Sequence, residues 1–335
     1  MTKISVIGAT TWGTTLSIVN ACSNQDNEIF LLTRSQHETE KLISDNQNSK
    51  FLPGYSFPSN IHITHSNSEA LDNTKLIIVA VPSFTFRKNL KSINNFVSPN
   101  AILLSATKGI EISSGLRMTQ IIQDELTNIS NQNICVLSGP NLANEIIQGK
   151  PCSSVVAGTN ETTIKTVQNI LNSELFRLYG NTDIVGVEIA GAMKNITAIA
   201  SGISEGLNFG DNAKSSLITR GLAEMTRFGV SMGAKQSTFS GLAGMGDLIA
   251  TCSSSKSRNT QLGIRIGQGE PLEDIQSSMV NVAEGVSTTQ AVMNIANSMK
   301  VTMPLTEAVY QVLFENIKPI DAYKSLMNRS IKLEN

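Results

Sequence analysis

A short turn near the N-terminus contains glycines at the spacing of a dinucleotide-binding motif. Gly8-Ala9-Thr10-Thr11-Trp12-Gly13 follows a β-branched apolar run and opens a segment of helical character. In such turns the first glycine permits the tight bend, the helix start faces a pyrophosphate, and a later glycine lets helix and strand pack closely. Thr10 replaces the middle glycine, and its side chain could crowd the phosphates. An ordinary strand–turn–helix connection is the alternative, but the context favours a nucleotide site at Gly8 and Gly13.

The segment after the second predicted strand bears on the kind of nucleotide. Sites for NAD usually carry an acidic residue about 20 residues past the turn, where it binds the ribose hydroxyls. The corresponding stretch here is Leu32-Thr33-Arg34-Ser35, which has an arginine and no acid. Because a guanidinium suits a 2′-phosphate, Arg34 predicts that NADP(H) is accepted and even preferred. A solvated arginine after a strand is the alternative interpretation.

A nicotinamide-dependent carbonyl reduction would also need a group that protonates the developing alkoxide. The only histidines are His37, His62 and His65, none of them in the second half of the chain or near the later strand ends. A histidine-based hydroxy-acid dehydrogenase is therefore not expected. None of the four tyrosines has a lysine four residues on, which excludes the Tyr-x-x-x-Lys arrangement of short-chain dehydrogenases. Lysine remains as the candidate proton donor.

Two lysines occupy positions where such chemistry is plausible. Lys108 follows the predicted strand Ile102–Ala106, at the sheet edge where open α/β folds bind ligands. Lys194 lies within a long predicted helix among small and apolar neighbours, where partial burial would make its pKa tunable. A lysine that extends along an apolar surface to reach solvent is the usual alternative for such a position.

The elements that would carry these residues divide the chain into two halves. The first half alternates short β-branched runs with helical stretches, which indicates βαβ units and a parallel sheet. The fold class is therefore α/β: an N-terminal doubly wound Rossmann domain (residues 1–183) followed by an all-α C-terminal domain (residues 184–335). The predicted strands are Ile4–Ile7, Glu28–Thr33, Leu76–Val81, Ile102–Ala106, Ile134–Ser138, Ser153–Gly158 and Phe176–Gly180. The predicted helices include Gly13–Ala21, Thr162–Leu171, Ile184–Glu205, Ser215–Gly229, Thr260–Gly267, Glu284–Ser298 and Leu305–Glu315.

Composition excludes several classes of protein. The net charge of -1 gives no basic excess for binding nucleic acid, so an anionic substrate would need a local cationic cluster. The four cysteines are scattered without a C-x-x-C pair, which argues against a zinc site or disulfide framework and fits a reducing cytoplasm. No apolar run of about 18 residues is present, so no integral membrane segment is expected. The strand signal starts at Ile4, which leaves no room for a signal peptide.

The motifs together closely resemble the NAD(P)-dependent glycerol-3-phosphate dehydrogenases of the bacterial biosynthetic type. The resemblance extends over essentially the whole chain, and its strength comes from the joint order and spacing of many motifs. The matching stretches are Val6–Leu16, Phe51–Gly54, Val79–Ser83, Thr107–Gly109, Ser138–Pro140, Glu188–Asn195, Gly241–Cys252, Ser257–Asn259, Asn281–Gly285 and Met303–Leu305.

The resemblance implies a role for each matching position. It implies that Lys194 is the catalytic acid/base that protonates the carbonyl of dihydroxyacetone phosphate, giving sn-glycerol 3-phosphate for phospholipid synthesis. It makes Lys108 a contact to both cofactor and substrate, and Asp247 a carboxylate near the reacting end. Further implied substrate contacts are Gly139, Asn141, Ser257, Arg258 and Asn259. Further implied cofactor contacts are Thr11, Trp12, Arg34, Ala143, Arg258, Val282 and Glu284. A homodimer is implied as well.

The residues from Thr251 to Thr260 also indicate phosphate binding by their own chemistry. A serine-rich run usually marks a flexible loop. This one ends in Ser257-Arg258-Asn259 just before a predicted helix, and so combines hydroxyl and amide donors, a bidentate cation and helix N–H groups. The preceding glycine-rich stretch, residues 241–246, would let Asp247 approach a ligand; a turn between helices is the alternative.

Three positions depart from the family pattern. Thr10 replaces a glycine, Asn141 stands where a small hydroxyl residue is common, and Leu142 replaces an aromatic residue. Asn141 can still hydrogen-bond a substrate hydroxyl. Thr10 leaves tight pyrophosphate binding in question.

Two other functions are compatible with part of the sequence. A dehydrogenase of a β-hydroxy acid also joins a Rossmann domain to helices and uses lysine, but its carboxylate substrate would not need Ser257-Arg258-Asn259. A non-catalytic NADP(H) sensor would explain the glycine turn and Arg34, but not the combination of Lys108, Lys194 and Asp247.

Overall fold

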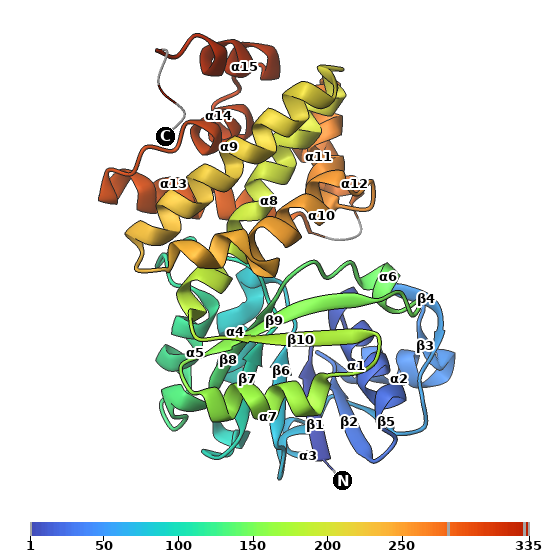
Figure 1. Ribbon diagram of the computed structural model, residues 1–335. Coiled ribbons are helices and arrows are strands. Elements are labelled where there is room, and N and C mark those ends of the chain that lie inside the picture. Colours follow the sequence, from blue (N-terminus) through green and yellow to red (C-terminus); the bar gives the residue numbers. More distant parts are fainter. Residues whose placement is uncertain (1, 280–281, 331–332, 334–335) are drawn as a thin grey trace. The chain divides into compact units, whose positions relative to one another are not determined.

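The computed structural model describes residues 2–279, 282–330 and 333 of the chain (Figure 1). These residues fold into two compact units. Unit 1 comprises Met1–Lys108 and Leu116–Val187, and unit 2 comprises Gly109–Gly115 and Glu188–Asn335. The short segment Gly109–Gly115 thus packs with unit 2 although its neighbours in sequence belong to unit 1.

Unit 1 is built around an eight-stranded sheet (Figure 1). The strands lie in the order β10-β9-β8-β7-β6-β1-β2-β5, and all neighbours are parallel except β8 and β9. A two-stranded antiparallel sheet, β3 with β4, is separate from it. The bounds are β1 (Thr2–Ile7), β2 (Asn27–Leu32), β3 (Gln47–Asn48), β4 (Leu52–Ser56), β5 (Ile61–Thr64), β6 (Leu76–Val79), β7 (Ile102–Ser105), β8 (Ile134–Ser138), β9 (Cys152–Gly158) and β10 (Phe176–Asn181).

The seven predicted strands are present, with ends that differ by one or two residues. The sequence reading missed β5, because Ile61-His62-Ile63-Thr64 is a single short alternation after a proline-containing loop and has no long apolar run. It also did not anticipate that β9 runs antiparallel to β8. Only the four-residue helix α6 (Ala143–Ile146) lies between these two strands, so the connection lacks the full crossover helix that parallel neighbours need.

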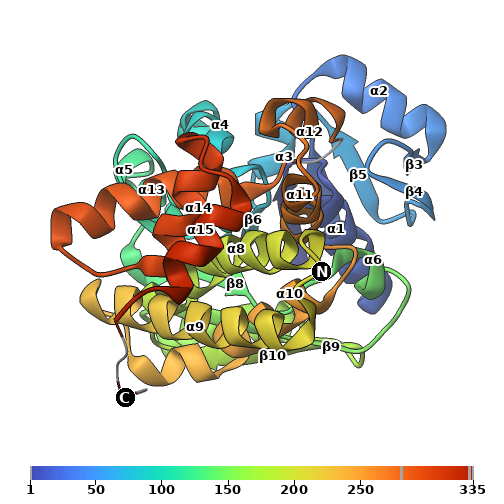
Figure 2. The same cartoon turned by 90° about the horizontal axis from the view of Figure 1, so that it is seen from above.

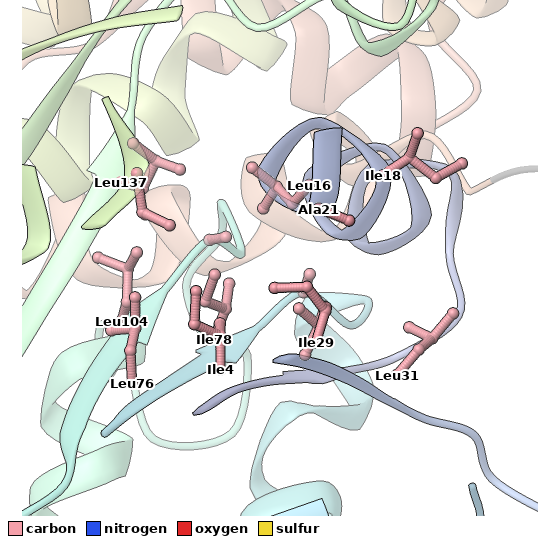
Figure 3. Close-up of a cluster of buried hydrophobic side chains, with 14 of the residues drawn as sticks. Ile4, Leu16, Ile18, Ala21, Ile29, Leu31, Leu76, Ile78, Leu104 and Leu137 are labelled. Atoms are coloured by element: carbon pink, nitrogen blue, oxygen red, sulfur yellow. The ribbon is translucent and has the colours of Figure 1, made fainter. Parts of the chain in front are cut away.

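Helices cover both faces of this sheet, as a doubly wound fold requires. Side chains alternate along each strand, so Ile4 and Ile78 join the apolar cluster on one face while Ile77 and Val79 join the cluster on the other. Figure 3 shows the first cluster, in which Leu16 and Ala21 of one helix lie above the strand side chains of β1, β2 and β6. The helices of unit 1 are α1 (Thr11–Ser23), α2 (Gln36–Asp45), α3 (Asn67–Leu71), α4 (Phe86–Ile93), α5 (Met118–Glu125), α6 and α7 (Glu161–Leu171).

The strand order reverses between β1 and β6. From β1 the chain continues outward to β2 and β5, whereas from β6 it continues in the other direction to β7 and β8. Open α/β sheets bind ligands at the carboxyl ends of the strands beside such a reversal, because the helices leave in opposite directions there. The residues that follow β1, β2, β6, β7 and β8 therefore meet at one edge of the sheet.

Unit 2 is helical throughout its described residues, apart from connecting loops and turns. Figures 1 and 2 show α8 and α9 side by side, and Gly221 of α9 faces the side chain of Thr197 of α8. The all-α character predicted for this half is confirmed, and α10, α12 and α15 are additional helices. The bounds are α8 (Ile184–Gly206), α9 (Gly210–Ser231), α10 (Asp247–Ser253), α11 (Arg258–Gly267), α12 (Leu272–Ser278), α13 (Glu284–Met299), α14 (Pro304–Phe314) and α15 (Pro319–Met327).

Helix α8 is long and apolar enough to cross a membrane when judged by length and composition alone. However, 89% of its most apolar window is buried inside the structure. A helix that is hydrophobic around most of its circumference suits the interior of a large folded unit. The apolar composition of α8 is therefore explained by its burial within the fold.

Candidate functional site

The glycine turn joins β1 to α1 and has the shape that the sequence predicts for a phosphate-binding turn. Gly8 has φ +107°, and a Cβ there would lie 2.7 Å from the side chain of Val81 and 2.9 Å from the carbonyl oxygen of Ala80. A Cβ on Gly13 would lie 2.0 Å from the carbonyl oxygen of Gly8. Both positions therefore require glycine, the first for its conformation and the second for close packing of helix on turn.

Thr10 is the N-cap of α1 and adopts an extended conformation, with φ -82°, so it carries no left-handed strain. Its hydroxyl accepts a hydrogen bond from the Gly13 N–H at 3.0 Å and donates one to the carbonyl of Ala80 at 2.8 Å. The hydroxyl thus holds the turn to the end of β6. Thr11 and Trp12 follow in the first helical turn, where backbone N–H groups have no carbonyl partner within the helix and can serve an anion.

The end of β2 lies directly beside this turn, because the Gly8 N–H donates to the carbonyl of Leu32 at 3.0 Å. Arg34 follows β2, and its side chain is 74% exposed. Glu38, in the first turn of α2, places its carboxylate beside Arg34. The Glu38 carboxylate accepts the backbone N–H of Arg34 at 3.1 Å and lies 3.5 Å from the guanidinium.

The residues after β7 and β8 form a second group at the same sheet edge. The Lys108 ammonium donates to the carbonyl of Gly139 at 2.9 Å. Gly139 has φ +149°, and a Cβ there would meet Ser154 at 2.9–3.0 Å, so only glycine fits. The Asn141 amide donates to the Ser154 hydroxyl at 3.1 Å. Ala143 is the first residue of α6 and is partly buried. Unit 1 therefore brings all its predicted site residues to one edge of the sheet.

In unit 2, Lys194 and Asp247 form a buried ion pair. The ammonium of Lys194 lies 2.6 Å from Oδ1 of Asp247 and 2.6 Å from the hydroxyl of Thr251. The side chains of Lys194 and Asp247 are 10% and 1% exposed. The Thr251 hydroxyl lies 3.2 Å from the same carboxylate oxygen, so the three groups form a closed triangle. A buried charge is costly without a partner, so each of these opposite charges offsets the loss of solvation of the other.

The glycine-rich stretch before Asp247 has regular backbone structure. Residues Leu242–Gly246 form a single π-helical turn that leads directly into α10, whose first residue is Asp247. Gly244 packs against the backbone of Phe239, where a Cβ would meet the carbonyl oxygen at 2.1 Å. Gly244 therefore allows the close packing of the turn that precedes Asp247, which is buried. π-turns of this kind are frequent at functional sites.

A cysteine adjoins the ion pair but stays neutral. Burial raises the pKa of the Cys252 thiol to about 12, and the nearby charges of Lys194 and Lys214 only partly oppose this effect. The thiol is therefore protonated at neutral pH and contributes no second negative charge beside Asp247.

Ser257-Arg258-Asn259 forms the start of α11, two residues earlier than the helix predicted from Thr260. Ser257 is the N-cap, and its hydroxyl accepts from the Thr260 N–H at 3.3 Å. The Asn259 amide donates to Asn195 Oδ1 at 2.9 Å, and its oxygen accepts from the Gly285 N–H at 2.9 Å. Asn259 therefore ties α11 to α8, beside Lys194, and to the start of α13. Arg258 is exposed and could turn its cation toward an anion at this helix N-terminus.

Two predicted cofactor contacts lie close to Arg258. The guanidinium donates to the carbonyl of Val282 at 2.9 Å, and Glu284, the first residue of α13, exerts an attractive electrostatic effect on it. Val282 is 42% exposed. Asn281, which begins the matching stretch in the sequence, lies outside the described residues.

Glycines allow α8 and α11 to approach closely and so position the polar groups of unit 2. A Cβ on Gly202 would lie 2.1 Å from the carbonyl oxygen of Thr260, and one on Gly263 would lie 2.2 Å from that of Ile199. Gly206 and Gly267 show the same pattern one turn further along. This backbone-to-backbone contact brings the start of α11 beside Asn195.

The sequence reading did not single out Thr251 or Asn195. Thr251 lies four residues after Asp247 on α10, so its helical spacing would have placed both on one face if that helix had been recognised. Asn195 gave no separate signal beside Lys194. Among residues 2–279, 282–330 and 333, no group of three histidine, cysteine, aspartate or glutamate side chains is arranged to hold a metal ion.

Comparison with known proteins identifies the relatives of this chain. Residues 3–164 match the family described as NAD-dependent glycerol-3-phosphate dehydrogenase N-terminus, and residues 183–324 match the corresponding C-terminus. A glycerol-3-phosphate dehydrogenase [NAD(P)+] of Dehalococcoides mccartyi is 46% identical over 98% of this chain and 91% of its own length. A protein of the same name from Corynebacterium glutamicum is 44% identical over the full length of both chains. The crystal structure of glycerol-3-phosphate dehydrogenase from Coxiella burnetii superposes with a TM-score of 0.93 at 34% identity, covering 98% of this chain and 99% of the other.

Proposed function

Because the chain belongs to the NAD-dependent glycerol-3-phosphate dehydrogenase family, we propose that it reduces dihydroxyacetone phosphate reversibly to sn-glycerol 3-phosphate with NAD(P)H. The observation that carries this proposal is the buried Lys194–Asp247 pair beside the Ser257-Arg258-Asn259 helix start. These groups combine a proton donor with an anion site, which are the two things a phosphorylated ketone requires.

The turn between β1 and α1 fits a dinucleotide. Any side chain at Gly8 or Gly13 would fill the space that the turn needs, and the first turn of α1 offers backbone N–H groups that have no carbonyl partner within the helix. Thr11, Trp12, Arg34 and Ala143 would hold the cofactor, with Lys108, Arg258, Val282 and Glu284 as further contacts. Bound NAD(P)H supplies the hydride.

Lys194 acts as the general acid in reduction and the general base in oxidation. In the protonated state it is stabilised by Asp247 and by the Thr251 hydroxyl, so a proton is in place when charge develops on the substrate oxygen. The same contacts fix the direction of the ammonium, so the Lys194 side chain has fewer accessible rotamers than a lysine on the surface. Asp247 and Lys108 orient the reacting end, and Gly139 and Asn141 contact the remainder of the substrate.

The substrate phosphate is held by Ser257, Arg258 and Asn259. The hydroxyl and the helix N–H groups offer hydrogen bonds, and the guanidinium supplies the positive charge. Holding this remote group aligns the carbonyl for reaction, so that phosphate binding energy supports the chemical step. We assign residues 184–335 as the substrate domain and residues 1–183 as the dinucleotide domain.

The product feeds glycerophospholipid synthesis. We place the enzyme in the cytoplasm, propose that it forms a homodimer, and expect no role in binding nucleic acid.

A substrate panel tests this function against a dehydrogenase of β-hydroxy acids and against a non-catalytic sensor. The protein is mixed with NADPH or NADH and either dihydroxyacetone phosphate or carboxylated ketones of similar size, and cofactor oxidation is followed by absorbance. We expect oxidation with the phosphorylated ketone only. Oxidation with the carboxylated ketones alone would favour the β-hydroxy acid activity, and cofactor binding without any turnover would favour the sensor.

A further inference from the structure

The end of β2 carries both of the charges that usually distinguish NAD sites from NADP sites. Dinucleotide folds for NAD place a carboxylate there to accept the ribose hydroxyls, whereas folds for NADP place an arginine there to bind the 2′-phosphate. The sequence shows only Arg34 at this position. The structure adds Glu38, whose carboxylate reaches back from the first turn of α2 to the Arg34 backbone N–H at 3.1 Å.

We propose that Glu38 determines how the site discriminates between NADH and NADPH, accepting the hydroxyls of the unphosphorylated ribose and opposing the 2′-phosphate that Arg34 attracts. This inference rests on the cofactor role proposed above for the turn and for Arg34. It revises the expectation drawn from Arg34 alone, because a strong preference for NADP(H) is not expected while Glu38 carries its charge.

The geometry supports a role in ligand binding beyond that of a helix cap. The Glu38 side chain is 20% exposed, so the carboxylate remains accessible while one oxygen holds the Arg34 N–H. The guanidinium, which is 74% exposed, lies 3.5 Å from that same oxygen. A phosphate bound by Arg34 would therefore come within a few ångströms of the carboxylate, where like charges repel. A ribose hydroxyl at the same place would instead donate to it.

The site also lies where an adenosine ribose would be expected. Arg34 follows Leu32, whose carbonyl accepts the Gly8 N–H at 3.0 Å, so the β2 end and the glycine turn are contiguous. Ser35 caps α2 by accepting the Glu38 N–H at 3.3 Å, which fixes the first helical turn and hence the origin of the Glu38 side chain.

The test compares Glu38→Gln with Glu40→Gln and measures cofactor binding without substrate. Glutamine keeps an oxygen that can accept the Arg34 N–H, so Glu38→Gln removes charge while retaining the local fold. Glu40 is exposed on the same helix and contacts Gln36 at 2.8 Å, which makes it a matched control for loss of charge. Trp12 is the only tryptophan and lies in the turn, so energy transfer from it to the reduced nicotinamide reports binding.

For Glu38→Gln we expect the ratio of Kd for NADH to Kd for NADPH to rise about fivefold or more. Glu40→Gln should change this ratio less than twofold. A smaller effect of Glu38→Gln, or an equal effect of Glu40→Gln, would overturn the proposal.

A second measurement uses the unaltered protein and does not depend on the folding of any variant. NADH that lacks the 2′-hydroxyl of its adenosine ribose should bind about fivefold more weakly than NADH. Equal affinity would overturn the acceptor role of Glu38. Because both readouts are binding constants, they remain interpretable if dihydroxyacetone phosphate is not the substrate. Conversely, turnover of dihydroxyacetone phosphate with an unchanged Kd ratio would refute only the role of Glu38.

Discussion

In unit 1 the candidate site residues lie on turns at the carboxyl ends of parallel strands, whereas in unit 2 the Lys194–Asp247 pair lies on two packed helices. The candidate site residues of unit 1 are positioned by the sheet register and by turns that need glycines such as Gly8. Those of them that carry side chains are mostly partly exposed. The pair in unit 2 depends on burial and on direct side-chain contacts. The difference teaches that backbone topology places the candidate cofactor contacts, while helix packing holds the charged pair proposed for proton transfer.

The largest effect on stability should come from separating the buried charges. Asp247→Asn leaves the Lys194 ammonium without its carboxylate, and we expect a loss of about 3 kcal/mol in the free energy of unfolding. Lys108→Met is the matched change in unit 1, and it should cost only about 1 kcal/mol because that ammonium is half-buried rather than enclosed and its bond to Gly139 is to a neutral carbonyl. Urea titration of both variants checks the comparison, and equal losses would contradict it.

Helix packing in unit 2 should also be sensitive to one added methyl group. Gly263→Ala would place a Cβ 2.2 Å from the carbonyl oxygen of Ile199, so α8 and α11 must separate, at a cost of about 1–3 kcal/mol. Gly246→Ala is the control, because a Cβ there meets only ordinary contacts, with Leu242 nearest at 3.5 Å. Thermal melting measures both. If Gly263→Ala had the same melting temperature as the wild type, the close contact between α8 and α11 would not contribute to stability.

The turn in unit 1 should depend on the Thr10 hydroxyl rather than on the absence of a side chain. Thr10→Val keeps the shape but removes the bonds to Gly13 and Ala80, and we expect a loss of about 1 kcal/mol in stability. Thr10→Ser keeps the hydroxyl and should melt close to the wild type. A tenfold tighter cofactor Kd in Thr10→Gly would show instead that the threonine side chain obstructs the phosphates.

The smallest effect concerns the reactivity of two buried cysteine thiols, one in each unit. Burial raises the pKa of Cys135 in β8 and of Cys252 in α10 to about 12, so at pH 8 only roughly one in 10⁴ of each is thiolate. The exposed Cys22 should react with a thiolate-specific reagent at once, while Cys135 and Cys252 stay protected until urea unfolds their units. Reactivity of the protected pair should rise with pH, since their thiolates form only toward pH 12. Rapid labelling of Cys252 at pH 8, located by mass spectrometry, would contradict its burial.

The parts of the molecule that could be predicted are those with local signals. Gly8 and Gly13 mark the turn because they satisfy backbone requirements within six residues, and the strands of the sheet are read from their β-branched runs. The antiparallel direction of β9, the short strand β5 and helix α10 had no comparable local pattern. The contacts of Lys194 with Asp247 and Thr251 join residues more than 50 positions apart. Nothing in the local sequence specifies such contacts. Lys194 was predicted by elimination of other proton donors and from its apolar helical surroundings, whereas the role of Asp247 came from the resemblance to a family. Glu38 was missed because its acid lies on α2 while the expected position was the end of β2.

The most direct measurement of the central claim is steady-state turnover of dihydroxyacetone phosphate with NADPH by the wild type and Lys194→Ala, together with cofactor Kd from Trp12 fluorescence. If Lys194 supplies the proton, kcat should fall about 10²- to 10⁴-fold while the cofactor Kd stays within twofold of the wild type. Folding of the variant is confirmed by circular dichroism, because Asp247 loses the ammonium that lies 2.6 Å from its carboxylate. A folded Lys194→Ala enzyme whose kcat remains within tenfold of the wild type would show that the proton comes from another group.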